Sequence, residues 1–468
     1  MLLTLSLAIL LQGFFVDAFA FEGESPALKE KWQIGVDAIM QPAIEAKRLV
    51  GAVVGIITPE GMAVYGYGAT KLNGKDVPDG DTVFYIASIT KTVTSLVLAQ
   101  MAENKDLKLT DPVAKFLPQG VTVPHYKGRE ITLLDLSTHH SGLPLMPSNF
   151  DLSNPVKSFK AYDTKMLYDF LSDHKLKYMP GTRYEYSNLG AGLLGHVLSL
   201  KSGKTYEDLV TDLVLKPLKM HDTGQSRNKI KNTLVTGYDW DLQKRVPWPD
   251  KVILEGAGAL YSTAHDMLRY LGANMGFIDS PLGKAMQITH VPKKKAQAKS
   301  IGLGWFISDH QGQTLVWHNG DTPSCSSWAG FIKSKNTGVV VLANTSTLFN
   351  GIIDDAGLNV VSLLLGRSYK PFIFPEEVKI KSGLLKEYSG EYRSQDAKKT
   401  VQIKPQAGGL WVVFSKNESI RFYAASETSF FSKLNLTNLV FKRDNLGTVS
   451  RLIFNTYDGD EAEYRRAR

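Results

Sequence analysis

Beyond its first 20 residues, the chain lacks the features that cross-link a protein or anchor it in a membrane. It holds one cysteine, Cys325, among 468 residues, so no disulfide bond can form within it. Beyond residue 20 no run is long and apolar enough to span a bilayer, and there are no repeats or low-complexity segments. We therefore expect a folded protein stabilised by the size of its core, with Cys325 as a buried thiol rather than a nucleophile.

The first 20 residues have the composition of a targeting segment. Residues 1–15 are apolar, and Ala18, Phe19 and Ala20 match a small-residue cleavage site. This pattern predicts a signal peptide at residues 1–20 and an exported protein, periplasmic or secreted, with no transmembrane helix after cleavage. Because the segment has no Lys or Arg, an uncleaved anchor is the alternative.

The charge of the chain is moderately positive. The formal net charge of +8 becomes +9 when Asp17, the one charged residue of the predicted signal peptide, is removed. The basic residues are dispersed and form no nucleic-acid-binding motif, so we expect no nucleic-acid partner. The sequence does not indicate an oligomeric state.

The first 370 residues predict an α+β catalytic domain at residues 21–370. Helical spacing appears at residues 27–47, 190–201 and 352–365, and strand-like runs at 51–57, 62–68, 84–87, 314–318, 327–332 and 338–343. Residues 106–286 are mostly helical in pattern, with long loops. The short connections between strands favour an antiparallel sheet flanked by helices, with a separate helical lobe.

The last part of the chain changes character after a proline-containing segment. We predict a linker at residues 371–383 and a small all-β module, a barrel or a sandwich, at residues 384–468. Its apolar and polar residues alternate in short runs at 400–403, 410–414, 420–422, 439–441 and 449–454.

The segment Ser88-Ile89-Thr90-Lys91 is the strongest chemical signal in the sequence. A helix that starts at Ser88 places Lys91 on the same face, one turn on. A serine hydroxyl needs a nearby base to become a nucleophile, and free amides at a helix start favour the oxyanion that it creates. Taken alone, the pattern also fits a capping serine followed by a solvated lysine.

Two later segments carry groups that complete such a site. Tyr186 and Asn188 flank a short turn before a helix, so a proton-shuttling phenol, with its pKa lowered by the lysine, and a substrate-binding amide can face one cleft. The alternative is a core tyrosine with a capping asparagine. In the segment 317–322, Gly320 permits close backbone approach, Asp321 offers a second oxyanion amide, and His318 is a polar group at the cleft.

The remaining histidines show no metal-ligand spacing. They include His139, His140, His196 and His265, the first two in a loop at residues 138–144 that could wall a pocket. We expect no metal and no cofactor.

These motifs, in this order, resemble those of the serine penicillin-recognising family, on the branch of class C β-lactamases and D-alanyl-D-alanine carboxypeptidases. Segments 111–118, 138–144, 216–220 and 258–267 add to the resemblance, which covers residues 28–365. It implies that Ser88 is acylated, that Lys91 and Tyr186 share the transfer of the Ser88 proton, and that Asn188 binds the substrate amide. It further implies that His318, Asn319 and Gly320 replace Lys-Thr-Gly in substrate binding, and that the amides of Ser88 and Asp321 form an oxyanion hole.

The histidine at position 318 departs from the lysine typical of efficient β-lactamases. A neutral imidazole attracts a substrate carboxylate less than an ammonium does. We therefore expect a serine hydrolase acting through an acyl-enzyme on D-Ala-ended peptides, peptidoglycan stems or β-lactams. An esterase or D-aminopeptidase on small acyl substrates, and a penicillin-binding sensor without turnover, are the alternatives.

Residues 385–392 resemble the opening of lipocalin-like barrels attached to some relatives.

Overall fold

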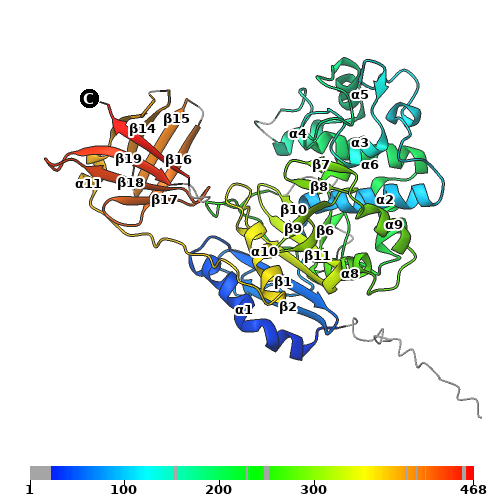
Figure 1. Ribbon diagram of the computed structural model, residues 1–468, viewed down its shortest axis with the longest axis horizontal. Coiled ribbons are helices and arrows are strands. Elements are labelled where there is room, and N and C mark those ends of the chain that lie inside the picture. The colour runs from blue at the N-terminus through cyan, green and yellow to red at the C-terminus, as the bar shows by residue number, and fades with distance from the viewer. Residues whose placement is uncertain are drawn as a thin grey trace, which may run out of the picture.

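The computed structural model describes residues 23–467 except 152, 154, 228–229, 231, 247–251, 397, 407, 417 and 456–459. The predicted signal peptide lies outside the described residues. In Figure 1 a mixed α/β part and a C-terminal barrel are joined by an extended segment. Within the described part of the chain, no helix has the length and apolar character needed to cross a membrane.

An eight-stranded antiparallel sheet forms the centre of the α/β part. Its order is β2-β1-β12-β11-β10-β9-β8-β7. The strands are β1 Gly51–Thr58, β2 Gly61–Gly68, β7 Lys294–Ala296, β8 Lys299–Ile301, β9 Phe306–His310, β10 Gln313–Asp321, β11 Ser326–Ile332 and β12 Thr337–Ala343. The sequence predicts five of them and misses β7, β8 and β9, since two of these have only three residues and contain exposed or half-buried lysines.

Helices cover both faces of this sheet, which explains why β1, β11 and β12 are buried along their whole length. Helices α1 (Pro26–Glu45) and α10 (Ile352–Leu364) pack on one face, and α8 (Ala264–Met275) packs on the other. The predicted helices at 27–47 and 352–365 are thereby confirmed. The predicted α+β class with an antiparallel sheet is confirmed as well.

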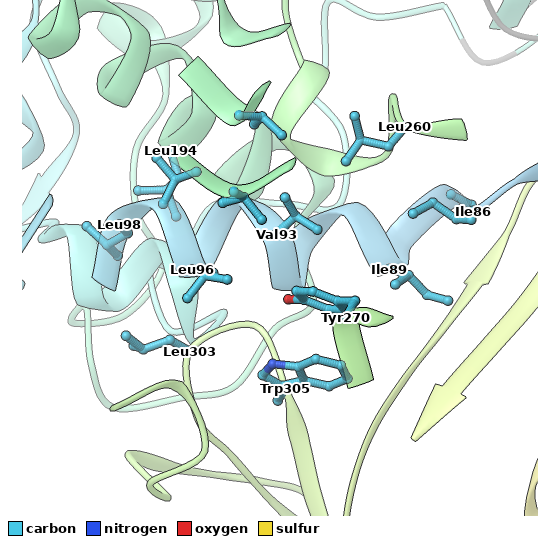
Figure 2. Packing of buried hydrophobic residues seen from close by; sticks show 14 of the residues in the cluster. Ile86, Ile89, Val93, Leu96, Leu98, Leu194, Leu260, Tyr270, Leu303 and Trp305 are labelled. Carbon is cyan, nitrogen blue, oxygen red and sulfur yellow. The ribbon is translucent and has the colours of Figure 1, made fainter. Parts of the chain in front are cut away.

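The helical lobe lies beyond α8 and surrounds α2 (Thr90–Glu103). It contains α3 Leu133–Ser137, α4 Pro155–Ala161, α5 Thr164–Asp173, α6 Asn188–Ser202, α7 Tyr206–Val210 and α9 Gly283–Thr289, with the small pairs β3–β6 (Phe84–Tyr85, Tyr261–Ser262) and β4–β5 (His125–Tyr126, Arg129–Glu130). Figure 2 shows α2 between Leu194 of α6 on one side and Tyr270 and Trp305 on the other. Because α2 is enclosed in this way, its first turn is a rigid platform for side chains.

The prediction that a helix starts at Ser88 is wrong in detail. A 3₁₀ turn, Ala87–Ile89, comes first, and the α-helix begins at Thr90. The predicted strand at 84–87 is also shorter, because the chain leaves the β3 pairing after Tyr85 to make this turn.

The C-terminal module is a closed eight-stranded antiparallel barrel. Its strands are β13 Gly390–Ser394, β14 Thr400–Gln406, β15 Gly409–Ser415, β16 Glu418–Ala424, β17 Ser429–Ser432, β18 Asn438–Arg443, β19 Val449–Asn455 and β20 Glu461–Arg466, and β13 pairs with β20. Helix α11, Ser382–Glu387, precedes them. The sequence predicts five strands and misses β13, β17 and β20, where charged or serine-rich residues hide the alternation.

Side chains join the barrel to the α/β part. The Arg48 guanidinium lies 5.4 Å from the ring centre of Phe374, in the connecting segment, and 5.0 Å from that of Phe431 in β17. The Tyr423 hydroxyl of β16 donates a hydrogen bond to Asp241 Oδ1 at 2.8 Å. The barrel therefore contacts both the end of α1 and a loop of the α/β part.

Candidate active site

Ser88 lies at the tip of the turn between β3 and α2. The residue before it, Ala87, has a φ of +47°, a left-handed conformation that L-residues rarely adopt. The turn leaves Ser88 partly exposed while its neighbours Ala87 and Ile89 are buried. Strain of this kind, held in place by a packed surrounding, presents the hydroxyl of Ser88 at the surface of a cavity.

Lys91 is the immediate partner of Ser88. Its Nζ lies 2.7 Å from Ser88 Oγ and donates a hydrogen bond to the Ala257 carbonyl at 2.6 Å. The side chain is almost fully buried, and this burial holds the pKa of Lys91 well below the usual value for lysine. Both hydrogen-bond partners are neutral groups, so the amine can be uncharged and can accept a proton.

Tyr186 faces both of these groups. Its hydroxyl is hydrogen-bonded to Ser88, and Lys91 Nζ lies 4.9 Å from the centre of its ring. Burial raises the pKa of Tyr186 above the usual value for tyrosine, opposite to the lowering expected from a nearby lysine, because the desolvated lysine does not supply a compensating positive charge. The structure therefore favours a protonated phenol beside a neutral amine.

Asn188 comes next to this group as the first residue of α6. Ser187 caps the helix by accepting the Gly190 amide on its hydroxyl at 2.8 Å, which orients the start of α6 toward the site. Asn188 lines the same cavity as Ser88. The predicted helix at 190–201 is confirmed, two residues longer at its start.

The end of β10 lies directly against the Ser88 turn. A Cβ on Gly320 would lie 2.4 Å from the Ile86 carbonyl oxygen and 2.9 Å from the Ser88 nitrogen, so only glycine fits there. Asp321 follows and lines the cavity with Ser88. The two backbones whose amides form the predicted oxyanion hole are thus adjacent.

His318 and Asn319 are placed differently from the cavity-lining residues. The His318 ring is buried against Phe306, with ring centres 5.0 Å apart, and its Nδ1 lies 2.5 Å from the Asn319 carbonyl oxygen. Burial lowers the pKa of His318 to about 3, so its ring is neutral. Because side chains alternate along a strand, Asn319 points to the opposite face and donates to Asp354 Oδ2 at 3.0 Å.

A cavity of about 40 Å³ opens beside Ser88. Apart from Ser88, Asn188, Asp321 and Thr322, the side chains around it are apolar, aromatic or absent. These are Tyr85, Ala87, Met146, Phe159, Val252, Leu254, Ala257, Gly258 and Ala259. The carboxylate of Asp321 is held by the Ser326 hydroxyl, so the cavity is suited to a largely apolar group.

Two residues near the site carry no signal that sequence reasoning recognised. His139 packs on Tyr186 with ring centres 4.4 Å apart, although its spacing suggests only a loop. Asp354, in the first turn of α10, is half-buried near Asp321, and desolvation together with repulsion from Asp321 raises the pKa of Asp354 to about 8. Neither contact has a local sequence signature, because each joins segments far apart in the chain.

Cys325 is buried and its thiol pKa is raised to about 11 by that burial, as expected for an unreactive thiol. Over the residues that the structure describes, no group of three His, Cys, Asp or Glu side chains is arranged to hold a metal ion.

This fold and this serine–lysine–tyrosine arrangement define a class of serine hydrolases. The family profile described as Beta-lactamase matches residues 36–359, and the chain belongs to the beta-lactamase family. The predicted resemblance and the predicted enzyme class are thereby confirmed.

Two curated relatives each cover about two thirds of the chain. The D-alanyl-D-alanine-carboxypeptidase/endopeptidase AmpH of Escherichia coli K12 is 30% identical over 329 residues, covering 66% of this chain and 83% of AmpH. A beta-lactamase of Pseudomonas fluorescens is 27% identical over 347 residues, covering 66% of this chain and 92% of that protein. The structure of the octameric penicillin-binding protein homologue from Pyrococcus abyssi covers 94% of this chain and all of that one, with a TM-score of 0.62 and 22% identity, and so supports the fold.

Proposed function

We propose that this protein is an exported serine hydrolase that acts through an acyl-enzyme on D-Ala-ended peptides, peptidoglycan stems or β-lactams. The observation that carries the proposal is the Ser88–Lys91 contact of 2.7 Å at the edge of a cavity, with a desolvated lysine and a hydrogen-bonded Tyr186. We further propose a signal peptide at residues 1–20, a catalytic domain at 21–370, a linker at 371–383 and a lipocalin-like module at 384–468.

The geometry supports a definite sequence of proton transfers. Neutral Lys91 accepts the proton of Ser88 as Oγ bonds to the substrate carbonyl carbon. The carbonyl electrons move onto oxygen, and the amides of Ser88 and Asp321 stabilise that oxyanion. Tyr186 donates its proton to the leaving nitrogen and regains one from Lys91, and the carbon–nitrogen bond breaks. Water then attacks the acyl-enzyme by the same groups in reverse, releasing the acid and free Ser88.

The choice of substrate rests on the family. AmpH is named a D-alanyl-D-alanine carboxypeptidase and endopeptidase, and the Pseudomonas fluorescens relative a beta-lactamase. Both reactions acylate a serine with a carbonyl that carries a nitrogen leaving group. We propose that Asn188 binds the amide of the acyl part, and that His318, Asn319 and Gly320 occupy the position of the Lys-Thr-Gly segment.

The test is intact mass spectrometry of the purified protein mixed with benzylpenicillin and followed over time. A mass increase of one penicillin that maps to Ser88, and its absence in Ser88→Ala, is the expected result. A persistent adduct indicates a penicillin-binding peptidase or a sensor, and an adduct that decays while penicillin is consumed indicates a β-lactamase. A Ser88→Ala protein that retains full hydrolytic activity contradicts the proposal.

A second candidate function, an esterase on small acyl groups, is favoured by the apolar lining of the cavity beside Ser88. Met146, Phe159 and Leu254 provide surface for an alkyl or aryl acyl group and no cation for a carboxylate. Its test is a series of p-nitrophenyl esters from acetate to octanoate alongside a D-Ala-D-Ala peptide. Higher kcat/KM for longer esters, with no release of D-Ala, selects the esterase. Release of D-Ala selects the peptidase.

A further inference from the structure

His139 makes two hydrogen bonds to the segment that carries Tyr186. Its carbonyl oxygen accepts the Glu185 amide at 2.9 Å, and its ring Nδ1 accepts the Ser187 amide at 3.2 Å. These two amides belong to the residues directly before and after Tyr186. His139 therefore holds the backbone on both sides of that tyrosine.

The conformation of His139 makes this double contact possible. Its φ of +56° is left-handed, and its side chain is only 2% exposed. The ring lies on Tyr186, with ring centres 4.4 Å apart and the planes inclined by 34°. His139 therefore contacts both the backbone on either side of Tyr186 and the ring of Tyr186 itself.

The neighbouring loop reinforces the same segment. The Ser187 hydroxyl donates to the Pro144 carbonyl at 2.6 Å, and the Asn188 amide donates to the Leu145 carbonyl at 3.0 Å. Among these contacts, only those of His139 reach the residues on both sides of Tyr186. Since Nδ1 accepts a hydrogen bond, the ring proton is on Nε2, and burial keeps the pKa of His139 low and the ring neutral.

We propose that His139 is a positioning residue, which sets the place of the Tyr186 hydroxyl relative to Ser88 and Lys91. This proposal rests on the proposed function, because it assigns His139 to the proton-transfer step of that reaction. Loss of the Nδ1 acceptor releases the Ser187 amide and lets Tyr186 shift. Such a shift of the Tyr186 hydroxyl affects the rate of acylation far more than it affects substrate binding.

The adjacent His140 is a matched control. It is also buried, but its ring nitrogens lie against the carbonyl oxygens of Thr138 and Lys295, and its ring contacts Tyr184 rather than Tyr186. His139→Asn is the conservative variant, because an asparagine Oδ1 can accept the Ser187 amide and asparagine tolerates a left-handed backbone.

The experiment measures the acylation rate constant and the dissociation constant for benzylpenicillin, or an activated ester, by stopped flow in the full-length protein. We expect His139→Ala to lower the rate constant about 10- to 100-fold with little change in the dissociation constant. His139→Asn should recover most of that loss, and His140→Ala should stay within about threefold of the wild type. Thermal melting of each variant reports on folding separately.

A double-mutant cycle with Tyr186→Phe identifies the route of the effect. If His139 acts through the tyrosine hydroxyl, His139→Ala changes acylation by at most about threefold in the Tyr186→Phe background. Equal losses in both backgrounds, an unaffected His139→Ala, or a His140→Ala loss of the same size each overturn the positioning role while leaving the proposed function intact. A wild-type protein that no probe acylates overturns both.

Discussion

Gly320 and the Ser88 nitrogen are so close that one added carbon would come within 2.9 Å of that nitrogen and 2.4 Å of the Ile86 carbonyl oxygen. Both contacts are with backbone, which cannot swing aside as a side chain can. The end of β10 and the nucleophile turn therefore keep their spacing only while position 320 has no side chain.

We accordingly expect Gly320→Ala to separate β10 from the turn and to displace the Asp321 amide from the Ser88 amide. The acylation rate should fall about 100- to 1,000-fold, the loss typical when one oxyanion donor is removed. Stopped-flow acylation measures this loss, and Gly383→Ala is the control, because Gly383 in α11 has open space around it and no left-handed backbone. Comparable losses in both variants would show that the close approach of Gly320 to the Ser88 turn does not determine the acylation rate.

Lys91→Arg tests whether the buried amine must lose its proton. Arginine stays charged, whereas burial holds the pKa of Lys91 low enough for a neutral amine. We expect acylation to fall about 100- to 10,000-fold at neutral pH, with the exposed Lys108→Arg unchanged. In the wild type, acylation should decline as the pH is lowered and Lys91 becomes protonated, and a rate that is independent of pH on the acidic side would contradict its role as the base.

Asp354 makes stability depend on pH. Burial and repulsion from Asp321 raise its pKa to about 8 in the folded state, above the ordinary carboxyl value of 3.8. The folded protein therefore binds this proton more tightly than the unfolded chain, and the stabilisation is fully present below about pH 4 and is lost as the pH rises to about 8.

Asp354→Asn should remove this contribution and flatten the melting temperature between those two pH values. Asparagine can still accept the hydrogen bond from Asn319. The measurement is thermal melting across the pH range in wild type, Asp354→Asn and the exposed Asp173→Asn. If Asp354→Asn keeps the wild-type slope, the carboxyl group is not the source of the pH dependence.

Tyr423→Phe tests the docking of the barrel on the α/β part. It removes the hydroxyl that bonds to Asp241 and leaves the rest of the side chain unchanged. A loss of about 1 kcal/mol shifts the docking equilibrium about fivefold, which should expose the connecting segment to trypsin at Lys379 and Lys381. Cleavage is followed by gel, with Tyr126→Phe as the control, and unchanged cleavage would show that this bond does not hold the barrel.

The chemistry of the site was predictable where neighbouring residues carry it. Ser88 and Lys91 are one helical turn apart, so their contact follows from spacing alone, and the same holds for the helix start that orients Asn188. The contact of His139 with Tyr186 joins residues 47 positions apart, and only the folded loop brings them together. The sequence predicts His318 as a polar group at the cleft. The burial of its ring against Phe306 was not predictable, because the five-residue strand β9 carries no clear sequence pattern.

The fold was predictable to the same extent. Runs of branched and small apolar residues mark β1 and β12, which are buried along their whole length. Strands such as β7 and β20 are rich in charged residues, and they exist because a neighbouring strand supplies their hydrogen bonds. Edge strands and barrel closure are therefore properties of pairing rather than of local composition.

The closure of the barrel determines how that domain can be altered. Because β13 pairs with β20, the barrel ends in no unpaired edge strand, and the contacts with the α/β part described above depend on individual side chains such as Arg48 and Tyr423. The strength of docking can then be changed one side chain at a time, without disturbing the hydrogen-bonded framework of either domain. In an engineered version, each of these side chains is a separate position at which the docking of the barrel can be weakened or strengthened.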